Sequence, residues 1–208
     1  MKSYNIHLIR HGETEDSGKY IGVTDVKLSQ EGINKLKKLD STCSYPYTKV
    51  IFTSPLKRCT ETCKILYPDI TPIIIEHLSE YNFGVWEGKT AKELENDENF
   101  KLWLAGDNSV KPEHGESNDS FVRRICIIFE NIVNGLIKTG TTDCVIVTHG
   151  GIIMTLLSIY GLPQAKPFDW VCDNGYGYSL RVTPMLWSRD KVCEVYAKTP
   201  LLKENDDE

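Results

Sequence analysis

The sequence has no long hydrophobic run, and none of its apolar stretches approaches the ~20 residues that a membrane-spanning helix needs. No apolar signal region follows the opening residues 1–5, so we expect a cytoplasmic protein with no membrane partner. Repeats, low-complexity stretches and linkers are absent as well. With 208 residues, 40% of them hydrophobic and 25% charged, we expect one domain over residues 1–208.

Cysteine is present but shows no metal-binding or disulfide pattern. The seven cysteines are odd in number, and no Cys-x-x-Cys occurs. Cys59 and Cys63 lie four residues apart in a predicted helix, but no His or further Cys stands beside them at zinc-ligand spacing. We therefore predict reduced thiols, no metal and no cofactor.

An excess of positive charge is also missing, since the formal net charge is −5. Nucleic-acid-binding proteins usually carry a basic stripe, so we predict no nucleic-acid partner. A focused pocket of Arg and His can still hold a small anion on an acidic protein. The charge therefore leaves open a small phosphorylated substrate.

Short apolar runs alternate with helical patterns along most of the chain. We expect strands over residues 5–10, 49–53, 72–76 and 144–148. We expect helices over residues 29–39, 55–66, 117–137 and 151–160, with one or two more within 90–104. Residues 178–183 and 192–198 alternate like edge or antiparallel strands.

This alternation predicts an α/β fold, a three-layer sandwich with helices on both faces of a mostly parallel sheet. An antiparallel strand is expected at the edge of the sheet. Residues 81–116 interrupt the alternation, and we predict that they form a cap over the site. The acidic tail, residues 203–208, is expected to be disordered.

Polar side chains gather where the predicted strands end, which is the edge at which open α/β sheets bind ligands. These residues are Arg10-His11-Gly12 after the first strand, Ser54 and Arg58 after the second, Glu80 after the third, and His149-Gly150 after the fourth. An Arg fork suits phosphate oxygens, and a His ring nitrogen can attack phosphorus. We further expect Ser54 to cap the helix over 55–66, so that Arg58 emerges near its positive end.

Five motifs in the same order resemble the histidine phosphatase superfamily, which contains the cofactor-dependent phosphoglycerate mutases. The resemblance covers about residues 5–183. The motifs are Arg10-His11-Gly12-Glu13-Thr14, Ser54-Pro55-Leu56-Lys57-Arg58, Leu78-Ser79-Glu80 with Phe83-Gly84-Val85-Trp86-Glu87-Gly88, Gly115-Glu116-Ser117, and His149-Gly150-Gly151.

The resemblance implies a metal-independent phosphomonoesterase that works through a phosphohistidine. His11 would be the nucleophile and Glu80 the proton donor, while Glu87 falls at a position that the family uses structurally. The phosphate pocket would consist of Arg10, Arg58, His149, Gly150 and Ser17.

Two departures from the mutases favour hydrolysis. Mutases follow the nucleophile motif with Trp-Asn, where this chain has Asp16-Ser17. They also carry Thr-Gly where this chain has Ile21-Gly22. A phosphoglycerate mutase remains an alternative, as do a broad-specificity phosphatase and, last, a non-catalytic phosphate-binding module.

Within the family, residues 20–29 and Gly115-Glu116-Ser117 look like the α-ribazole phosphatases of cobalamin biosynthesis. The implied substrate is α-ribazole 5′-phosphate, which carries an aromatic base. Five aromatic residues could stack on that base or belong to the core: Tyr20, Tyr81, Phe83, Trp86 and Trp103. We expect a monomer or a homodimer that acts on a small phosphate monoester.

Overall fold

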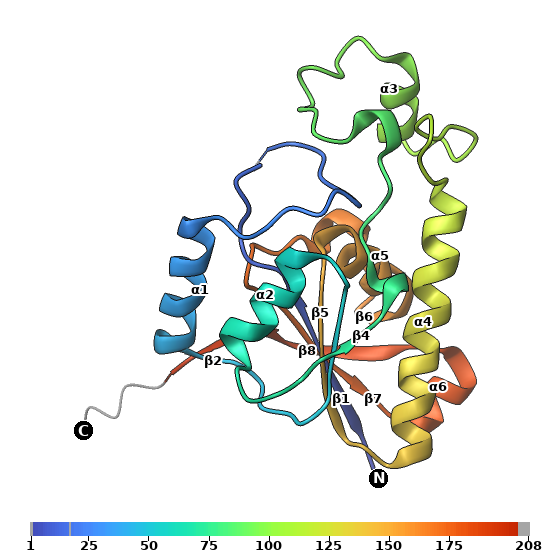
Figure 1. Ribbon diagram of the computed structural model, residues 1–208. Coiled ribbons are helices and arrows are strands. Elements are labelled where there is room, and N and C mark those ends of the chain that lie inside the picture. The colour runs from blue at the N-terminus through green and yellow to red at the C-terminus, as the bar shows by residue number, and fades with distance from the viewer. Residues whose placement is uncertain (1, 17, 204–208) are drawn as a thin grey trace.

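The computed structural model describes residues 2–16 and 18–203. Its main sheet has seven strands in the order β4-β3-β5-β1-β7-β8-β6 (Figure 1). The strands are β1 (Tyr4–Arg10), β3 (Ile51–Thr53), β4 (Ile73–Ile74), β5 (Asp143–Thr148), β6 (Gly161–Leu162), β7 (Gly177–Val182) and β8 (Cys193–Thr199). A second, two-stranded sheet pairs β2 (Cys43–Ser44) with β9 (Leu201–Leu202).

The sheet is mostly parallel, as the sequence predicts, but its antiparallel strand is not at the edge. β7 pairs antiparallel with both β1 and β8, and β6 then pairs parallel with β8. β7 is buried along nearly its whole length because it lies between two neighbours. At Gly177 a Cβ atom would lie 1.8 Å from the Leu8 carbonyl oxygen, so only glycine permits this approach to β1.

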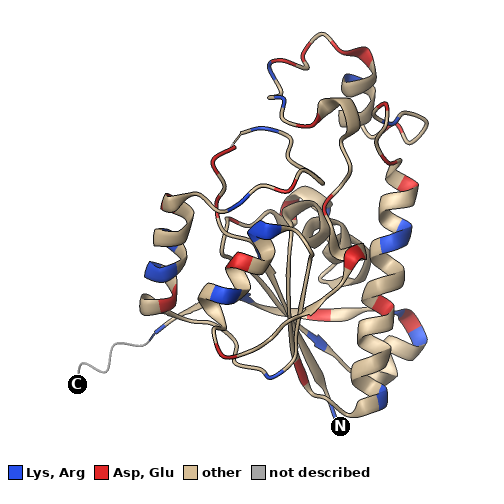
Figure 2. Cartoon of the chain, in the orientation of Figure 1, with Lys and Arg blue, Asp and Glu red and all other residues tan. Residues whose placement is uncertain are grey.

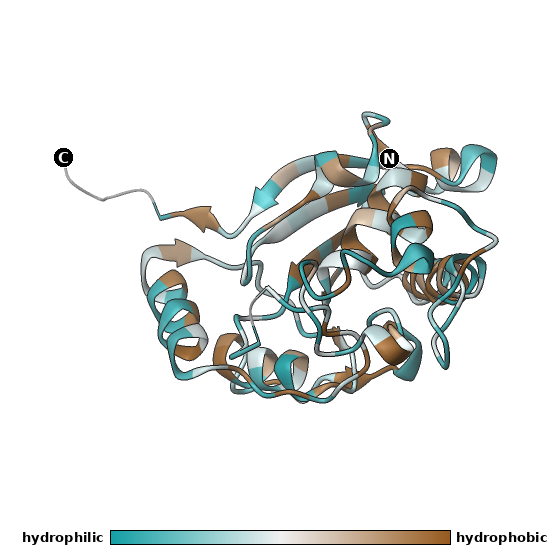
Figure 3. Cartoon of the chain, turned by 90° about the horizontal axis from the view of Figure 1, so that it is seen from above, coloured by the Kyte–Doolittle hydropathy of each residue, from teal (hydrophilic) through white to brown (hydrophobic). Residues whose placement is uncertain are grey.

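Helices cover both faces of the sheet, which gives the three layers that the alternation predicts. The α-helices are α1 (Gln30–Thr42), α2 (Lys57–Leu66), α3 (Glu98–Leu104), α4 (Asn118–Thr139), α5 (Gly150–Tyr160) and α6 (Pro184–Asp190). Seen from above, these helices carry both hydrophobic and hydrophilic residues, as expected for helices packed on a sheet (Figure 3).

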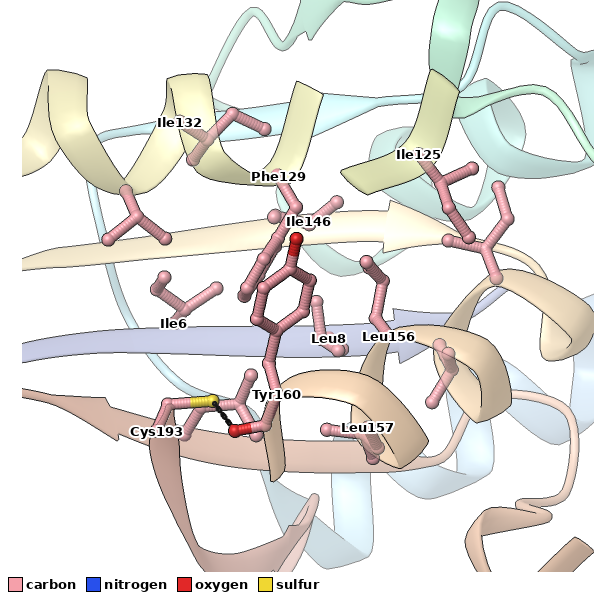
Figure 4. Close-up of a cluster of buried hydrophobic side chains, with 14 of the residues drawn as sticks. Ile6, Leu8, Ile125, Phe129, Ile132, Ile146, Leu156, Leu157, Tyr160 and Cys193 are labelled. Atoms are coloured by element: carbon pink, nitrogen blue, oxygen red, sulfur yellow. Dashed lines mark hydrogen bonds between the residues drawn. The ribbon is translucent and has the colours of Figure 1, made fainter. Parts of the chain in front are cut away.

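Alternate residues of β5 enter two different cores. Cys144 and Ile146 belong to the core beneath α4, α5 and α6, whereas Val145 and Val147 belong to the core beneath α1 and α2. Both faces of this strand are therefore covered, which explains its continuous apolar sequence. The larger core is shown in Figure 4, where Phe129 of α4 and Tyr160 of α5 meet above β1 and β5.

Several predicted boundaries move when the chain folds. The strand expected over 72–76 shortens to Ile73–Ile74, and the helical region 90–104 yields only α3. The helix expected over 55–66 begins at Lys57, and Ser54 does not cap it. The Ser54 hydroxyl accepts from the Leu56 amide, which precedes the helix, and is also bonded to the His149 ring.

Residues 81–116 rise above the end of the sheet at which β1, β3 and β5 finish (Figure 1). They include the 3₁₀ helix η2 (Gly84–Trp86) and α3. Trp86, Leu94 and Phe100 form a small separate core there, against which Tyr20 packs. The region therefore has apolar packing of its own.

Within residues 2–16 and 18–203, no helix combines the length and hydropathy that crossing a bilayer requires. Lys and Arg residues are interspersed with Asp and Glu residues along the helices and loops (Figure 2). Of the tail expected to be disordered, Lys203 is held by bonds to the carbonyls of Asp40, Ser41 and Thr42. Residues 204–208 lie outside the described part of the chain.

Candidate active site

His11 directly follows β1 and is fixed as a neutral ring. Its Nδ1 donates to the Gly12 carbonyl across 2.7 Å, so Nε2 carries the free lone pair. Burial lowers the His11 pKa to about 3, and the nearby Arg58 and Arg10 charges add to that effect. An imidazole in this state is a nucleophile at neutral pH.

Two guanidinium groups flank His11, and each is anchored by the protein. Arg10 at the end of β1 donates from Nη1 to the Cys172 carbonyl across 2.7 Å. Its buried Nε has no hydrogen-bond partner among the described residues. An unpaired buried N–H lowers the stability of the fold, and an anion bound in the site would provide the acceptor. Arg58 in the first turn of α2 donates to the carbonyls of Thr24 and Gly22 and is 1% exposed. Burial lowers the Arg58 pKa, but a guanidinium stays charged.

His149 lies behind this pair rather than at the surface of the cavity. Its Nδ1 accepts from Arg58 Nε across 3.2 Å, and its Nε2 lies 2.8 Å from the Ser54 hydroxyl. The side chain is fully buried, and burial lowers the His149 pKa well below its usual value, as do the adjacent His11 and Arg58. Both ring nitrogens are thus engaged within the protein, and the place in the phosphate pocket that the family resemblance implies for His149 stays a prediction.

The carboxyl group of Glu80 faces the start of α5. One carboxyl oxygen accepts from the Tyr81 amide and the other from the Gly151 amide, each across 3.0 Å. Burial raises the Glu80 pKa, although these two hydrogen bonds and Arg58 oppose the change. A Cβ at Gly151 would lie 2.7 Å from Glu80 Oε1, so the Glu80 carboxyl group would have to shift to admit a side chain there.

Arg10, His11, Arg58 and Glu80 line a polar cavity of about 170 Å³. The sequence-predicted residues that line it are Arg10, His11, Arg58, Glu80 and Gly150. His149 is not among them, and Ser17 lies outside the described residues. Three segments far apart in the sequence therefore bring an imidazole, two guanidinium groups and a carboxyl group to one space.

A second, mainly apolar cavity of about 570 Å³ adjoins the first, and Glu80 and Gly151 line both. Four of the five aromatic residues considered above line its wall: Tyr20, Tyr81, Phe83 and Trp103. Trp86 is 1% exposed and belongs to the small core of the cap. Phe168, which the sequence did not single out, is 75% exposed at this cavity.

Glu87 has a structural position. Its carboxylate accepts from the backbone amides of Gly22, Val23 and Phe83, which joins the loop after β1 to the cap. This arrangement agrees with the role that the family resemblance implies. Glu87 does not line the polar cavity, whereas Glu80 lines it together with Glu13 and Asp16.

Asn174 precedes Gly175 in the sequence, which indicates a turn first and a residue that could contact substrate second. Its side-chain amide donates to the carbonyls of His11 and Gly12, and the Gly175 amide donates to the Arg10 carbonyl. Asn174 also lines the polar cavity. The turn signal in Asp173-Asn174-Gly175 is visible in the sequence, but its contact with the nucleophile segment is long-range.

The two cysteines considered as a metal pair are buried thiols whose pKa values are raised by burial. Cys59 Sγ lies 3.5 Å from His149 Nε2 and packs behind the site. Over the described ranges, no three His, Cys, Asp or Glu side chains are grouped so that they could hold a metal ion.

Comparison with known proteins agrees with this geometry. A family model described as histidine phosphatase superfamily (branch 1) matches residues 6–193. The chain is 28% identical over 206 residues to an adenosylcobalamin/alpha-ribazole phosphatase of Salmonella typhimurium, covering 94% of each protein. It is 27% identical over 174 residues to phosphoserine phosphatase 1 of Hydrogenobacter thermophilus, covering 80% of this chain and 81% of the relative.

The fold is also similar to that of the alpha-ribazole phosphatase from Shigella flexneri. The TM-score is 0.75 at 22% sequence identity, and the match covers 96% of each chain. Because the family model spans residues 6–193, this protein belongs to branch 1 of the histidine phosphatase superfamily and is a hydrolase of phosphate monoesters.

Proposed function

We propose that the protein hydrolyses the 5′-phosphate of a small metabolite with an aromatic base, of the α-ribazole 5′-phosphate type, through a phosphorylated His11. The observation that carries this proposal is the pair of adjoining cavities. A polar one holds His11, Arg10, Arg58 and Glu80, and an aromatic-walled one opens from it at Glu80.

In the first step, His11 Nε2 attacks phosphorus while the bond from phosphorus to the ester oxygen breaks. Arg10 and Arg58 neutralise the negative charge on the equatorial oxygens as fixed donors, the role that metal ions have in other phosphoryl-transfer enzymes. Glu80 gives its proton to the departing alkoxide, and its raised pKa favours the protonated form that this requires.

In the second step, water attacks the phosphorus of phosphohistidine and the phosphorus–nitrogen bond breaks. The ionised Glu80 takes a proton from that water, which restores the acid for the next cycle. His11 Nδ1 keeps its proton throughout because the Gly12 carbonyl accepts it. His149 and Ser54 orient Arg58 from behind, so we assign His149 a positioning role instead of direct phosphate contact.

The apolar cavity supports an aromatic leaving group. Tyr81, Phe83 and Trp103 pack against one another at its wall with ring centroids 5.0 to 5.8 Å apart, and Phe168 stands at the rim. Aromatic walls of this kind favour a flat, apolar base by stacking and area burial. Residues 81–116 form the cap that supplies part of this wall.

The test is phosphate release from a panel of monoesters: α-ribazole 5′-phosphate, phosphoserine, glycerol 2-phosphate and p-nitrophenyl phosphate. We expect release from all four, with the highest kcat/KM for α-ribazole 5′-phosphate, and we expect His11→Ala to abolish it. Phosphate release by His11→Ala at the wild-type rate would exclude the phosphohistidine route. Equal kcat/KM values across the panel would instead indicate a broad-specificity phosphatase.

A mutase is tested separately with 3-phosphoglycerate and 2,3-bisphosphoglycerate. Rapid interconversion of the phosphoglycerates with little phosphate release would overturn the proposed hydrolysis. We expect the opposite ratio.

A further inference from the structure

Arg124 of α4 uses its guanidinium group entirely within the protein. Nη1 donates to the carbonyls of His77 and Ser79, and Nη2 donates to the Glu80 carbonyl across 2.8 Å. Nε and Nη2 also bond the two carboxylate oxygens of Glu116 across 3.0 and 2.7 Å. Five hydrogen bonds thus start from one side chain.

These bonds converge on the backbone that carries the proposed proton donor. Three of the four consecutive residues 77–80 present their carbonyls to Arg124. At the same time, the Glu80 carboxyl group is held on its other side by the amides of Tyr81 and Gly151. The backbone of Glu80 and its carboxyl group are therefore fixed from two different helices, α4 and α5.

Glu116 extends the same arrangement to the cap. Its Oε1 accepts from the Asn82 amide, its own amide donates to the Asn82 carbonyl, and its carbonyl accepts from the Tyr81 hydroxyl. Residues 81 and 116 are the two ends of the cap segment. The Arg124–Glu116 pair therefore joins both ends of the cap to the backbone segment that bears Glu80.

We propose that Arg124, together with Glu116, is a positioning residue that aims the Glu80 carboxyl group at the leaving-group oxygen. This inference rests on the proposed role of Glu80 as proton donor. Arg124 lines neither cavity, so it acts through the Glu80 backbone and not through substrate. Three carbonyls and a carboxylate match the planar fork of Arg, which Lys cannot reproduce.

The test uses the leaving group as its readout. A phenolate such as p-nitrophenolate departs without a proton, whereas the alkoxide of glycerol 2-phosphate needs one. The ratio kcat/KM reports the step in which the leaving group departs, before hydrolysis of the phosphohistidine. For Arg124→Met we expect kcat/KM with glycerol 2-phosphate to fall by about 10- to 100-fold. A positioned general acid accelerates such a step by ~10²–10⁴-fold, and a misplaced one should lose part of that acceleration. With p-nitrophenyl phosphate we expect a fall of less than about threefold.

Arg123→Met is the matched control, because this neighbouring Arg on α4 is exposed. It should leave both kcat/KM values unchanged. If Arg124→Met lowers kcat/KM equally for both substrates, Arg124 has only a general structural role and the inference is wrong. An unchanged kcat/KM with glycerol 2-phosphate also contradicts it.

Glu80→Gln separates failure of this inference from failure of the proposed function. If Glu80→Gln shows no preference between the two substrates, Glu80 is not the proton donor and the proposed mechanism fails. If Glu80→Gln shows the preference but Arg124→Met does not, only the positioning role fails. The double variant should lose no more than Glu80→Gln alone, because both changes remove one function.

If Arg124→Met does not fold, Glu116→Gln and Arg124→Lys test the inference in its place. Glu116→Gln keeps a hydrogen-bond acceptor for Arg124 but removes the charge. We therefore expect the same substrate preference, with a smaller fall in kcat/KM for glycerol 2-phosphate. Inhibition by vanadate should stay within about twofold of wild type in each variant, because the phosphate-binding residues are untouched. Loss of vanadate inhibition would indicate a wider disturbance and would count against the proposal.

Discussion

Arg58 Nε donates to His149 Nδ1 across 3.2 Å, and both side chains are almost completely buried. This bond sets the tautomer of His149: Nδ1 accepts, so the neutral ring carries its proton on Nε2 and donates it to Ser54. Arg58 also lines the polar cavity. The chain from Ser54 through His149 to Arg58 is thus a support for the proposed phosphate pocket.

Ser54→Ala tests this support. The change leaves the buried Nε2–H of His149 with only the weak acceptor Cys59 Sγ, 3.5 Å away among the described residues, and the loss of the hydroxyl costs about 1–3 kcal/mol. We expect the free energy of unfolding, measured by urea titration, to fall by about that amount. We also expect KM for p-nitrophenyl phosphate to rise, because Arg58 loses its orientation. Ser41→Ala, at an exposed serine of α1, is the control and should change neither quantity.

The stability of the fold should decrease with acid. His7, His11 and His149 all have pKa values lowered from 6.5, chiefly because burial penalises the charged ring. Below pH 6.5 the unfolded chain therefore binds more protons, and the stabilisation is complete above that pH and lost as the pH falls. For each such histidine the free energy of unfolding should approach a slope of about 1.4 kcal/mol per pH unit.

The measurement is urea unfolding at several values between pH 7.5 and 5. His7→Gln should reduce the slope by up to the contribution of one proton, since His7 does not line the polar cavity and its ring is hydrogen-bonded to Ser179. Glu80 contributes with the opposite sign, because its raised pKa favours the folded state at low pH. A slope identical in wild type and His7→Gln would show that His7 does not titrate on unfolding.

Gly151→Ala should remove general acid catalysis while leaving the nucleophile in place. The added methyl group would lie 2.7 Å from Glu80 Oε1, so the carboxyl group must move away. We expect kcat/KM for glycerol 2-phosphate to fall by at least about tenfold, within the ~10²–10⁴-fold range of a placed acid. Gly135→Ala in α4 is the control, because nothing lies within 4 Å of its Cβ position. Its helix should gain about 0.5–1 kcal/mol of stability with activity unchanged.

Phe168→Ala tests the aromatic cavity. This side chain is 75% exposed at the rim, so its removal should leave the melting temperature unchanged. KM for α-ribazole 5′-phosphate should rise about 3- to 10-fold, in keeping with about 0.5–1.5 kcal/mol for an aromatic pair, while KM for glycerol 2-phosphate should not change. Tyr47→Ala removes another exposed ring, 82% exposed and away from both cavities, and should affect neither substrate.

Vanadate and EDTA separate the two ways of stabilising phosphoryl transfer. Vanadate adopts the five-coordinate geometry of the transition state, so we expect competitive inhibition that weakens in Arg10→Ala. We expect EDTA to leave kcat unchanged, because Arg10 and Arg58 supply the positive charge. Inactivation by EDTA with recovery on adding Mg²⁺ would contradict the proposed mechanism.

Local patterns predicted most of the architecture. The apolar runs ending in Arg10 and Thr148 become β1 and β5, and the amphipathic stretch after Ser117 becomes α4 with Ser117 as its cap. The strand ends also indicated the site, because parallel strands carry their last residues to one edge of the sheet. His11, Arg10, Arg58 and Glu80 line one cavity for that reason.

Other features depended on which distant residues meet. Ser54 reads as a helix cap, yet its hydroxyl binds His149, 95 positions away, because burial leaves that ring nitrogen no water to bond. β7 lies inside the sheet because β8 pairs with its far side, a choice that alternation alone does not encode.

A net charge of −5 without a basic stripe is compatible with a focused pocket of positive charge, and the strand ends indicated where that pocket would lie. The bonds from Arg124 to the Glu80 backbone and from Arg58 to His149 depend on contacts that exist in the folded chain alone. Sequence periodicity reports which face of an element is apolar, whereas hydrogen-bond partners are chosen by packing between elements that are far apart in the chain.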